Sequence, residues 1–424
     1  MPSVPTPHRR LTLQGLKQAL GPGILLASAA IGGSHLVAST QAGALYGLGL
    51  LGLLLAANLF KYPFLLVGSR FTAATGLSLL EGYQRQSSWY LLAYLLVTLS
   101  TGIANIAAVT AVAASLASVL IPGTAAQQPV VLLLLCLMVL LLGHYRTLDR
   151  LTKWVVSLLV VSTLFAASAT LMHGPSAPYS ELFSPSPWTW TSLPFLVALM
   201  GWMPCPLDLS AWTSLWIAAK ERDTGHRSSL KAVEADFNLG YGATVVMAVL
   251  FLILGAWVMH GTGVSLAPEG GAFAKQLIHL FTANLGSWSA PLIAVAAFTT
   301  MFSTTLTCLD GYPRSAAASI QILRGQSGAA VYNQRQQQLW MLLHFAMAAA
   351  VLLWWSGSLG SLVTTAMWVS FVTTPLLAWM NLQVMQGSLV APHERFGPTM
   401  LLISRIGLLF LSLFVVLFAV SLVS

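Results

Sequence analysis

The side chains best suited to bind an ion or a small solute lie at two points within apolar stretches. The first is Gly32, Gly33, Ser34 and His35, and the second is the MPCPLD sequence, which holds Cys205, Pro206 and Asp208. Imidazole, thiolate and carboxylate groups bind soft ions such as zinc or copper. His35, Cys205 and Asp208 are therefore one candidate set of metal ligands. The alternative is a hydrogen-bonded core histidine and a small packed cysteine.

Two charged side chains lie deep inside the apolar stretches, Lys61 and Asp208. An unpaired charge at the bilayer centre costs about 2.5–3.5 kcal/mol on insertion scales, so opposite charges gain by pairing. One interpretation is a structural ion pair that joins two helices. The other is a coupling pair that opens for substrate or a proton.

The composition is that of a polytopic membrane protein in a lipid bilayer. Hydrophobic residues make up 57% of the 424 residues and charged residues 7%, against about 25% in a soluble domain. The net charge of +8 comes from short loops and indicates topology, not nucleic-acid binding. No P-loop or catalytic arrangement is evident, so we expect neither an enzyme nor a cofactor. All three cysteines lie in apolar runs, which argues against a disulfide framework.

Hydropathy predicts eleven membrane helices, at residues 22–46, 48–70, 89–120, 129–145, 153–172, 189–218, 237–260, 287–312, 338–356, 360–384 and 400–423. If they alternate in direction, the basic loop residues fall on one side, and only Lys275 falls on the other. The positive-inside rule then predicts a cytoplasmic N-terminus and an external C-terminus. We expect the membrane to be a prokaryotic plasma membrane. The charged segment 220–237 is predicted to be a largely helical linker, and the DGYPR sequence at 310–314 to end the eighth helix with an ion pair.

The two polar points fall where the first and sixth helices should be most regular. Glycine gives no side chain to hold the backbone, and proline lacks the amide hydrogen that a helix needs. Broken helices in matching positions predict an inverted repeat with a substrate site at the bilayer midplane, although two unrelated kinks would give the same pattern. We expect an N-terminal segment 1–21, repeats at 22–188 (helices 1–5) and 189–399 (helices 6–10), and a last helix in 400–424.

The stretch GPGILLASAAIGGSHLVASTQAGALYG resembles the first helix of the NRAMP family of proton-coupled divalent-metal transporters. ANLFKYP and TGLSLLEGY are similar to that family's second helix and the loop beyond it. The resemblance implies an all-helical, LeuT-like 5+5 inverted repeat with helices 1 and 6 unwound, followed by an eleventh helix. It also implies a secondary transporter that works by alternating access.

The chain departs from the family where the metal binds. The Asp-Pro-Gly-Asn motif of the family is replaced by Gly32, Gly33, Ser34 and His35, and its Met-Pro-His by Cys205, Pro206 and Leu207. Two acidic residues of helix 3, linked to proton movement, are replaced by Gly102 and Asn105. A divalent cation at mid-membrane needs charged or strongly dipolar ligands to replace its water shell. We therefore expect that the chain does not carry Mn²⁺ or Fe²⁺ by the family's chemistry.

Three alternatives remain for the substrate. His35, Cys205 and Asp208 would suit a soft or divalent metal ion. The glycine-rich break, with Trp202, Trp212 and Tyr62 as candidate lining residues, would suit a small organic solute or an anion. The third alternative is a receptor or scaffold that uses a transporter fold without transport.

Overall fold

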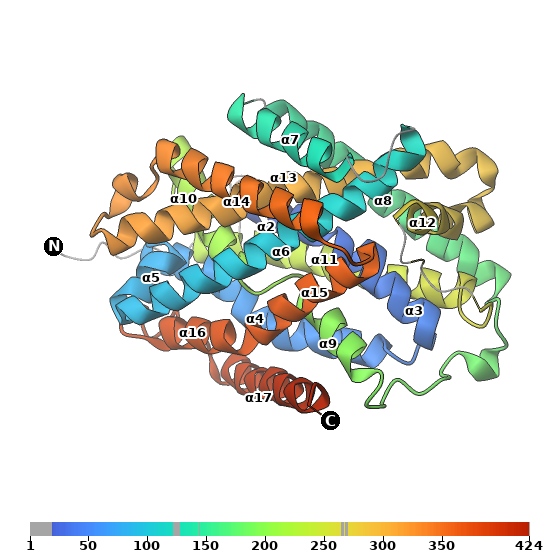
Figure 1. Cartoon of the computed structure of the whole chain (residues 1–424). Coiled ribbons are helices and arrows are strands. Elements are labelled where there is room, and N and C mark those ends of the chain that lie inside the picture. The colour runs from blue at the N-terminus through green and yellow to red at the C-terminus, as the bar shows by residue number, and fades with distance from the viewer. Residues whose placement is uncertain (1–18, 122–127, 144, 264–266, 268–269, 424) are drawn as a thin grey trace.

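The chain is described by a computed structural model that covers residues 19–121, 128–143, 145–263, 267 and 270–423, so most of the predicted N-terminal segment and Ser424 lie outside the described residues. Within this part the regular elements are helices, packed side by side (Figure 1). Besides the short 3₁₀ turns η2 (Tyr179–Glu181), η3 (Ser287–Ser289) and η4 (Gly328–Val331), they are α2 (Pro22–Ala30), the π-helical turn η1 (Ser34–Ser39), α3 (Thr40–Tyr46), α4 (Leu51–Thr75), α5 (Leu79–Gln86), α6 (Ser88–Leu120), α7 (Gln128–Leu141), α8 (Tyr145–His173), α9 (Leu193–Trp202), α10 (Leu209–Thr224), α11 (Leu230–Val258), α12 (Gly270–Leu285), α13 (Ala290–Leu323), α14 (Gln334–Trp354), α15 (Leu359–Val372), α16 (Thr374–Gln386) and α17 (Pro398–Ser421).

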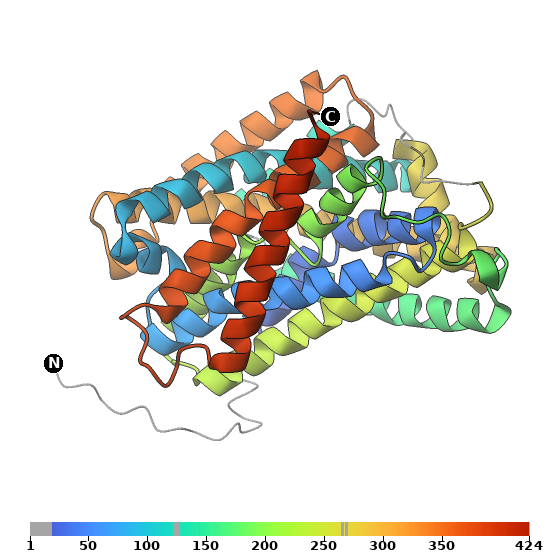
Figure 2. The same ribbon diagram turned by 90° about the horizontal axis from the view of Figure 1, so that it is seen from below.

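The described helices confirm an all-helical membrane protein. Seven continuous spans are long and apolar enough to cross a bilayer, and the bent pair α2–α3 makes an eighth. Shorter apolar helices at Pro129–Leu141, Ser157–His173 and Leu193–Trp202 lie where three further spans are predicted. The count of eleven remains a prediction. The last helix, α17, runs along the outside of the bundle (Figure 2), and only 28% of its apolar window is buried by the rest of the chain.

The predicted interruption of the first helix is confirmed. Residues Pro22–Ala30 and Ser34–Tyr46 meet at an angle of 46°. Ile31 leaves the helical conformation, with φ −74° and ψ 84°, and the chain then re-enters through a π-helical turn. Irregular backbone at this depth is tolerated only where protein or a cavity surrounds it, and here Gly32 and Gly33 are buried.

The predicted interruption of the sixth helix is confirmed as well. Helix α9 ends at Trp202 and α10 begins at Leu209. Between them, Pro204 and Pro206 each lack the amide hydrogen that would continue the helix. Met203 has an extended conformation, so the chain crosses the gap in a non-helical form.

Helix α11 holds both halves of the first helix through close glycine contacts. A Cβ atom on Gly23 would lie 2.1 Å from the carbonyl oxygen of Asp236, and one on Gly255 would lie 2.1 Å from that of Thr40. The carboxylate of Asp236 also accepts hydrogen bonds from the amides of Gly21 (3.0 Å) and Gly23 (2.6 Å) at the start of α2. These amides have no partner within the helix, so Asp236 satisfies them.

Two predicted boundaries are wrong, and one helix was not predicted. Helix α13 does not end at the DGYPR sequence but continues through Pro313 to Leu323. Its ion pair is present inside the helix instead, between Arg314 Nη2 and Asp310 Oδ1 at 2.8 Å. Burial of 72% of the apolar window of this span explains how packing overrides one proline. Helix α11 begins at Leu230 rather than 237, so the helical parts of the predicted linker belong to α10 and α11. Helix α12 was not among the predicted helices.

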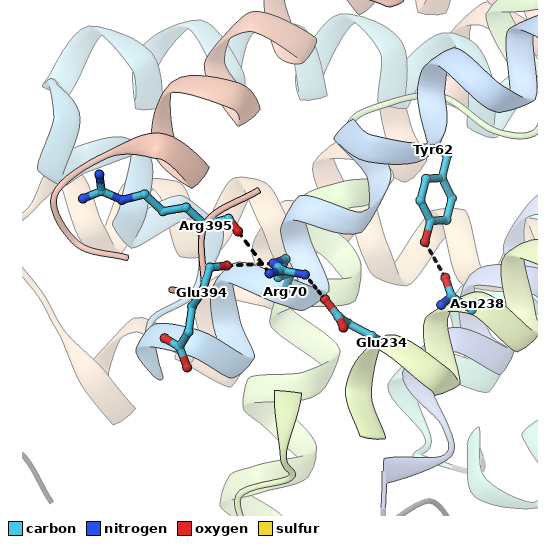
Figure 3. Close-up of polar contacts among 6 residues, drawn as sticks. All are labelled: Tyr62, Arg70, Glu234, Asn238, Glu394 and Arg395. Atoms are coloured by element: carbon cyan, nitrogen blue, oxygen red, sulfur yellow. Dashed lines mark hydrogen bonds and ion pairs between the residues drawn. The ribbon is translucent and has the colours of Figure 1, made fainter. Parts of the chain in front are cut away.

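Segments predicted to share one side of the membrane contact one another. Arg70, at the end of α4, forms an ion pair with Glu234 of α11 and donates to the carbonyls of Glu394 (2.8 Å) and Arg395 (3.2 Å) (Figure 3). Lys220, near the end of α10, donates to the carbonyl of Leu20 at 2.6 Å. The loops after the second, sixth and tenth predicted helices therefore meet at one end of the bundle. Which side of the membrane that end faces remains a prediction.

Candidate functional site

A small cavity lies between the two helix breaks. Its volume is about 30 Å³, enough for one or two water molecules. It is lined by Ala29, Ala30, Gly33, Ser34, Asn105, Val109, Trp202, Cys205, Pro206, Leu209, Thr304, Cys308 and Tyr312. The structure thus brings Gly33, Ser34, Cys205 and Pro206 together, whereas Gly32, His35 and Asp208 are not among the lining residues.

The glycines of the first break allow two larger side chains to approach the backbone. A Cβ atom on Gly32 would lie 2.6 Å from Thr304 Oγ1, and one on Gly33 would lie 2.5 Å from the indole of Trp202. Any larger side chain at these two positions would therefore collide with Thr304 and Trp202 in their present positions. Thr304 and Trp202 therefore fill the space beside the two glycines.

Asn105 of α6 joins four helices at the wall of the cavity. Its Nδ2 donates to the hydroxyls of Tyr312 (2.7 Å) and Ser370 (3.1 Å), and its Oδ1 accepts from Trp202 Nε1 at 2.8 Å. Only an amide can donate and accept in this way, since a carboxylate has no hydrogen to give. Asn105, expected from the resemblance to stand where a proton-path residue has been lost, therefore has a structural role.

The second position, Gly102, is filled by a neighbour. A Cβ atom there would lie 2.9 Å from the ring of Tyr312. An acidic side chain at 102 would displace that ring and, through it, the hydrogen bond to Asn105. Gly102 and Asn105 of α6 thus both face Tyr312 of α13.

His35 is a hydrogen-bonded core histidine. Its Nε2 lies 2.9 Å from the carbonyl oxygen of Thr244, and its Nδ1 lies 3.0 Å from that of Ala30 and 2.6 Å from Ser34 Oγ. Both ring nitrogens already have partners. The described part of the chain contains no group of three His, Cys, Asp or Glu side chains placed to hold a metal ion, so it does not assemble His35, Cys205 and Asp208 into such a group.

Asp208 is buried at the start of α10. Its Oδ2 accepts a hydrogen bond of 2.6 Å from the hydroxyl of Thr101, whereas Oδ1 is buried and forms no hydrogen bond. A negative charge is favoured at a helix N-terminus, where unpaired amides and the helix dipole concentrate positive potential. The location of the carboxylate therefore offsets part of the cost of its burial.

Lys61 of α4 is completely buried and reaches the other side of the same break. Its ammonium group donates to three carbonyl oxygens, those of Met200 (2.5 Å), Gly201 (2.9 Å) and Cys205 (3.2 Å). No ion pair joins Lys61 to Asp208, and both residues lie within the described part of the chain. Lys61 is instead held by carbonyls at the end of α9 and in the break, and Asp208 by the hydroxyl of Thr101 in α6.

Sequence reasoning missed the contribution of the eighth predicted helix. Thr304, Cys308 and Tyr312 line the cavity from α13, and their spacing of four residues places them on one helix face. Of the three aromatic residues expected at the site, only Trp202 lines it. Trp212 packs edge-to-face on Tyr312, and Tyr62 donates to Asn238 between α4 and α11 (Figure 3).

The fold matches solved transporter structures. A manganese transporter of Eremococcus coleocola superimposes with a TM-score of 0.70 at 15% identity, over 97% of this chain and 87% of that one. A transporter of the nucleobase-cation-symport-1 family, in a closed conformation with bromovinylhydantoin bound, gives 0.55 at 14% identity, over 95% and 92%. At such identities the matches establish the fold alone.

Sequence comparison identifies the family. A protein of Pasteurella multocida (strain Pm70), named as an uncharacterized protein, is 38% identical over 410 residues, which are 94% of this chain and 91% of that protein. The Nramp family model, described as natural resistance-associated macrophage protein-like, matches residues 23–421. The chain, with its two broken helices and its carbonyl-bound lysine, therefore belongs to the Nramp family of membrane transporters.

Proposed function

We propose that this protein is a secondary transporter that works by alternating access, with its substrate site in the cavity between the two helix breaks. We propose further that it does not carry Mn²⁺ or Fe²⁺ by carboxylate coordination. Family membership and the broken-helix fold support the first statement. The chemistry of the cavity wall supports the second.

The observation that most strongly supports the second statement is that the cavity wall carries no charge. Within the described residues, every lining side chain is uncharged at neutral pH. The nearest formal charges, Lys61 and Asp208, have opposite signs and balance each other. A dication in this cavity would meet no uncompensated carboxylate, and hard cations need oxygen ligands that restore their lost hydration.

The lining is suited to a small solute without a net positive charge. Ser34, Asn105 and Tyr312 offer hydroxyl and amide groups, and Trp202 offers an apolar face. Ligand sites commonly combine a few placed polar groups with an apolar wall. The present volume suits only a water or two, so the proposal requires the cavity to widen when one side opens.

The predicted repeats give the motion a framework. Residues 22–188 and 189–399 would be related by an axis in the membrane plane, with one broken helix in each. Rocking of one group of helices against the other would expose the cavity to each side in turn. The N-terminus would be cytoplasmic and the C-terminus external, as the distribution of basic loops predicts.

A metal ion held by neutral ligands is the second candidate. The family favours it, a protein of the same fold is named a manganese transporter, and two thiols, Cys205 and Cys308, line the cavity. Thiol sulfur favours soft ions over manganese. This candidate predicts binding that is lost when both cysteines become serine.

Uptake into proteoliposomes tests the proposal. Manganese, iron, zinc and magnesium would be compared with amino acids and organic acids that raise the melting temperature of the purified protein. We expect no saturable manganese or iron uptake, and saturable uptake of at least one solute that is weakened by Asn105→Asp. Robust manganese uptake would overturn the substrate assignment. Absence of flux for every stabilising ligand would favour a receptor without transport.

A further inference from the structure

The ammonium group of Lys61 occupies a cluster of backbone carbonyls. Three oxygens from the end of α9 and the break that follows lie 2.5, 2.9 and 3.2 Å from Nζ. The side chain belongs to another helix, α4, and is 0% exposed. All three hydrogens of the ammonium group therefore have an oxygen partner from one short segment.

Such a cluster is itself a place for a cation. The last carbonyls of a helix have no amide partner, and the helix dipole makes this end negative. In transporters with broken helices, carbonyls of the unwound segment and of half-helix C-terminal ends coordinate sodium or protons. The carbonyls of Met200, Gly201 and Cys205 have this chemical character, and the bound group is a monovalent cation.

We propose that these three carbonyls form a monovalent-cation site that Lys61 fills permanently, so that the protein carries a tethered cation where a free ion would bind. The proposal rests on the proposed function only in that the same break borders the cavity. A free sodium or potassium ion is excluded because the ammonium group occupies the oxygens. The site is then closed to ion coupling as long as Lys61 is present.

The surroundings of Lys61 hold it by geometry. The ammonium group is fully buried, and three carbonyl oxygens lie within 3.2 Å of Nζ. Asp208 lies across the break at the positive end of α10 and forms no contact with Nζ. Removal of the ammonium group would therefore leave three carbonyls and a nearby carboxylate without a positive charge, which is an environment that attracts a free cation.

The test is a cation titration of the purified full chain with Lys61→Met. Thermal unfolding would be measured in sodium, potassium and lithium chloride against N-methyl-D-glucamine chloride at constant ionic strength. We expect a saturable rise in melting temperature of about 2 °C or more for at least one alkali ion in Lys61→Met, and none in the wild type.

A matched control is Lys220→Met. Lys220 also donates to a backbone carbonyl, that of Leu20 at 2.6 Å, but at the end of the bundle. We expect this variant to respond to alkali ions as the wild type does. A similar response in Lys220→Met would show a general effect of removing a lysine and would overturn the proposal.

Other outcomes also decide. A saturable response in the wild type, or folded Lys61→Met without any response, would overturn the proposal. If Lys61→Met does not fold, the titration would be repeated with Lys61→Gln and Lys61→Ser. Failure of both variants to fold in every salt would overturn the proposal, because a site that accepts a free ion should be stabilised by one. These results do not depend on any substrate, so they leave the uptake test of the proposed function independent.

Discussion

Lys61 donates a hydrogen bond of 3.2 Å to the backbone carbonyl of Cys205, a residue that lines the cavity between the helix breaks. A buried positive charge thus lies one residue behind the wall of the candidate substrate site. Asp208, three residues further along the chain, places a negative charge at the start of α10. The break of the sixth helix therefore holds both charges without a contact between them.

The first prediction concerns the partner of Asp208. Thr101→Val should destabilise the protein by about 2 kcal/mol, because it removes the hydroxyl that donates to the carboxylate at 2.6 Å. In double-mutant cycles with Asp208→Asn, the coupling to Thr101→Val should exceed the coupling to Lys61→Met. The reverse order, measured by unfolding of the purified variants, would restore the direct pairing of Lys61 with Asp208.

The second prediction concerns the first helix break. Gly32→Ala should cost about 1–3 kcal/mol, since the new methyl group would lie 2.6 Å from Thr304 Oγ1. Thr304→Ala removes that atom, so the double variant should recover at least half of the loss. Equal destabilisation by Gly32→Ala with and without Thr304 would show that backbone freedom, not space, requires the glycine.

The third prediction concerns Asn105. Asn105→Asp should destabilise the protein by about 2 kcal/mol or more, because a carboxylate cannot donate to Tyr312 and Ser370 and adds a buried charge. Tyr312→Phe, which removes a single hydroxyl, should cost about 1 kcal/mol and serves as the control. If both variants unfold at the same temperature, the donor role of the amide is wrong.

The fourth prediction concerns the end of the bundle in Figure 3. Arg70→Gln should cost about 1–2 kcal/mol, because the guanidinium joins Glu234 to the carbonyls of Glu394 and Arg395. Glu234→Gln should cost less, about 0.5 kcal/mol, since Arg70 keeps both carbonyls and the pair is partly exposed. Unfolding in low and high salt checks this, and a larger loss for Glu234→Gln would contradict it.

The sequence predicted the elements that a strong local signal specifies. Gly32-Gly33 and Pro204-Pro206 break their helices because of backbone chemistry that any neighbour must accept. The end of α13 was misplaced because Pro313 is a strong local signal that buried packing overrode. Helix α12 was missed because its apolar stretch is short, and no broken or unusual sequence marks it.

The site was predicted only in part, for a physical reason. Gly33, Ser34, Cys205 and Pro206 line the cavity because the breaks themselves form its wall. His35 and Asp208 bind backbone and hydroxyl partners from other helices, such as Thr244 and Thr101, and hydropathy carries no information about such partners. Lys61 is buried, as its position within an apolar stretch predicts, but its carbonyl partners depend on how far α9 unwinds.

The most direct test is titration of the detergent-purified protein with Mn²⁺, followed by the electron paramagnetic resonance signal of the free ion. The manganese transporter of Eremococcus coleocola is the positive control. We predict that the free Mn²⁺ signal with this protein will match that of buffer alone, because the cavity wall has no carboxylate to replace the hydration of the ion. The account would be contradicted if the free Mn²⁺ signal fell saturably as protein was added and a cavity substitution such as Asn105→Asp altered that loss.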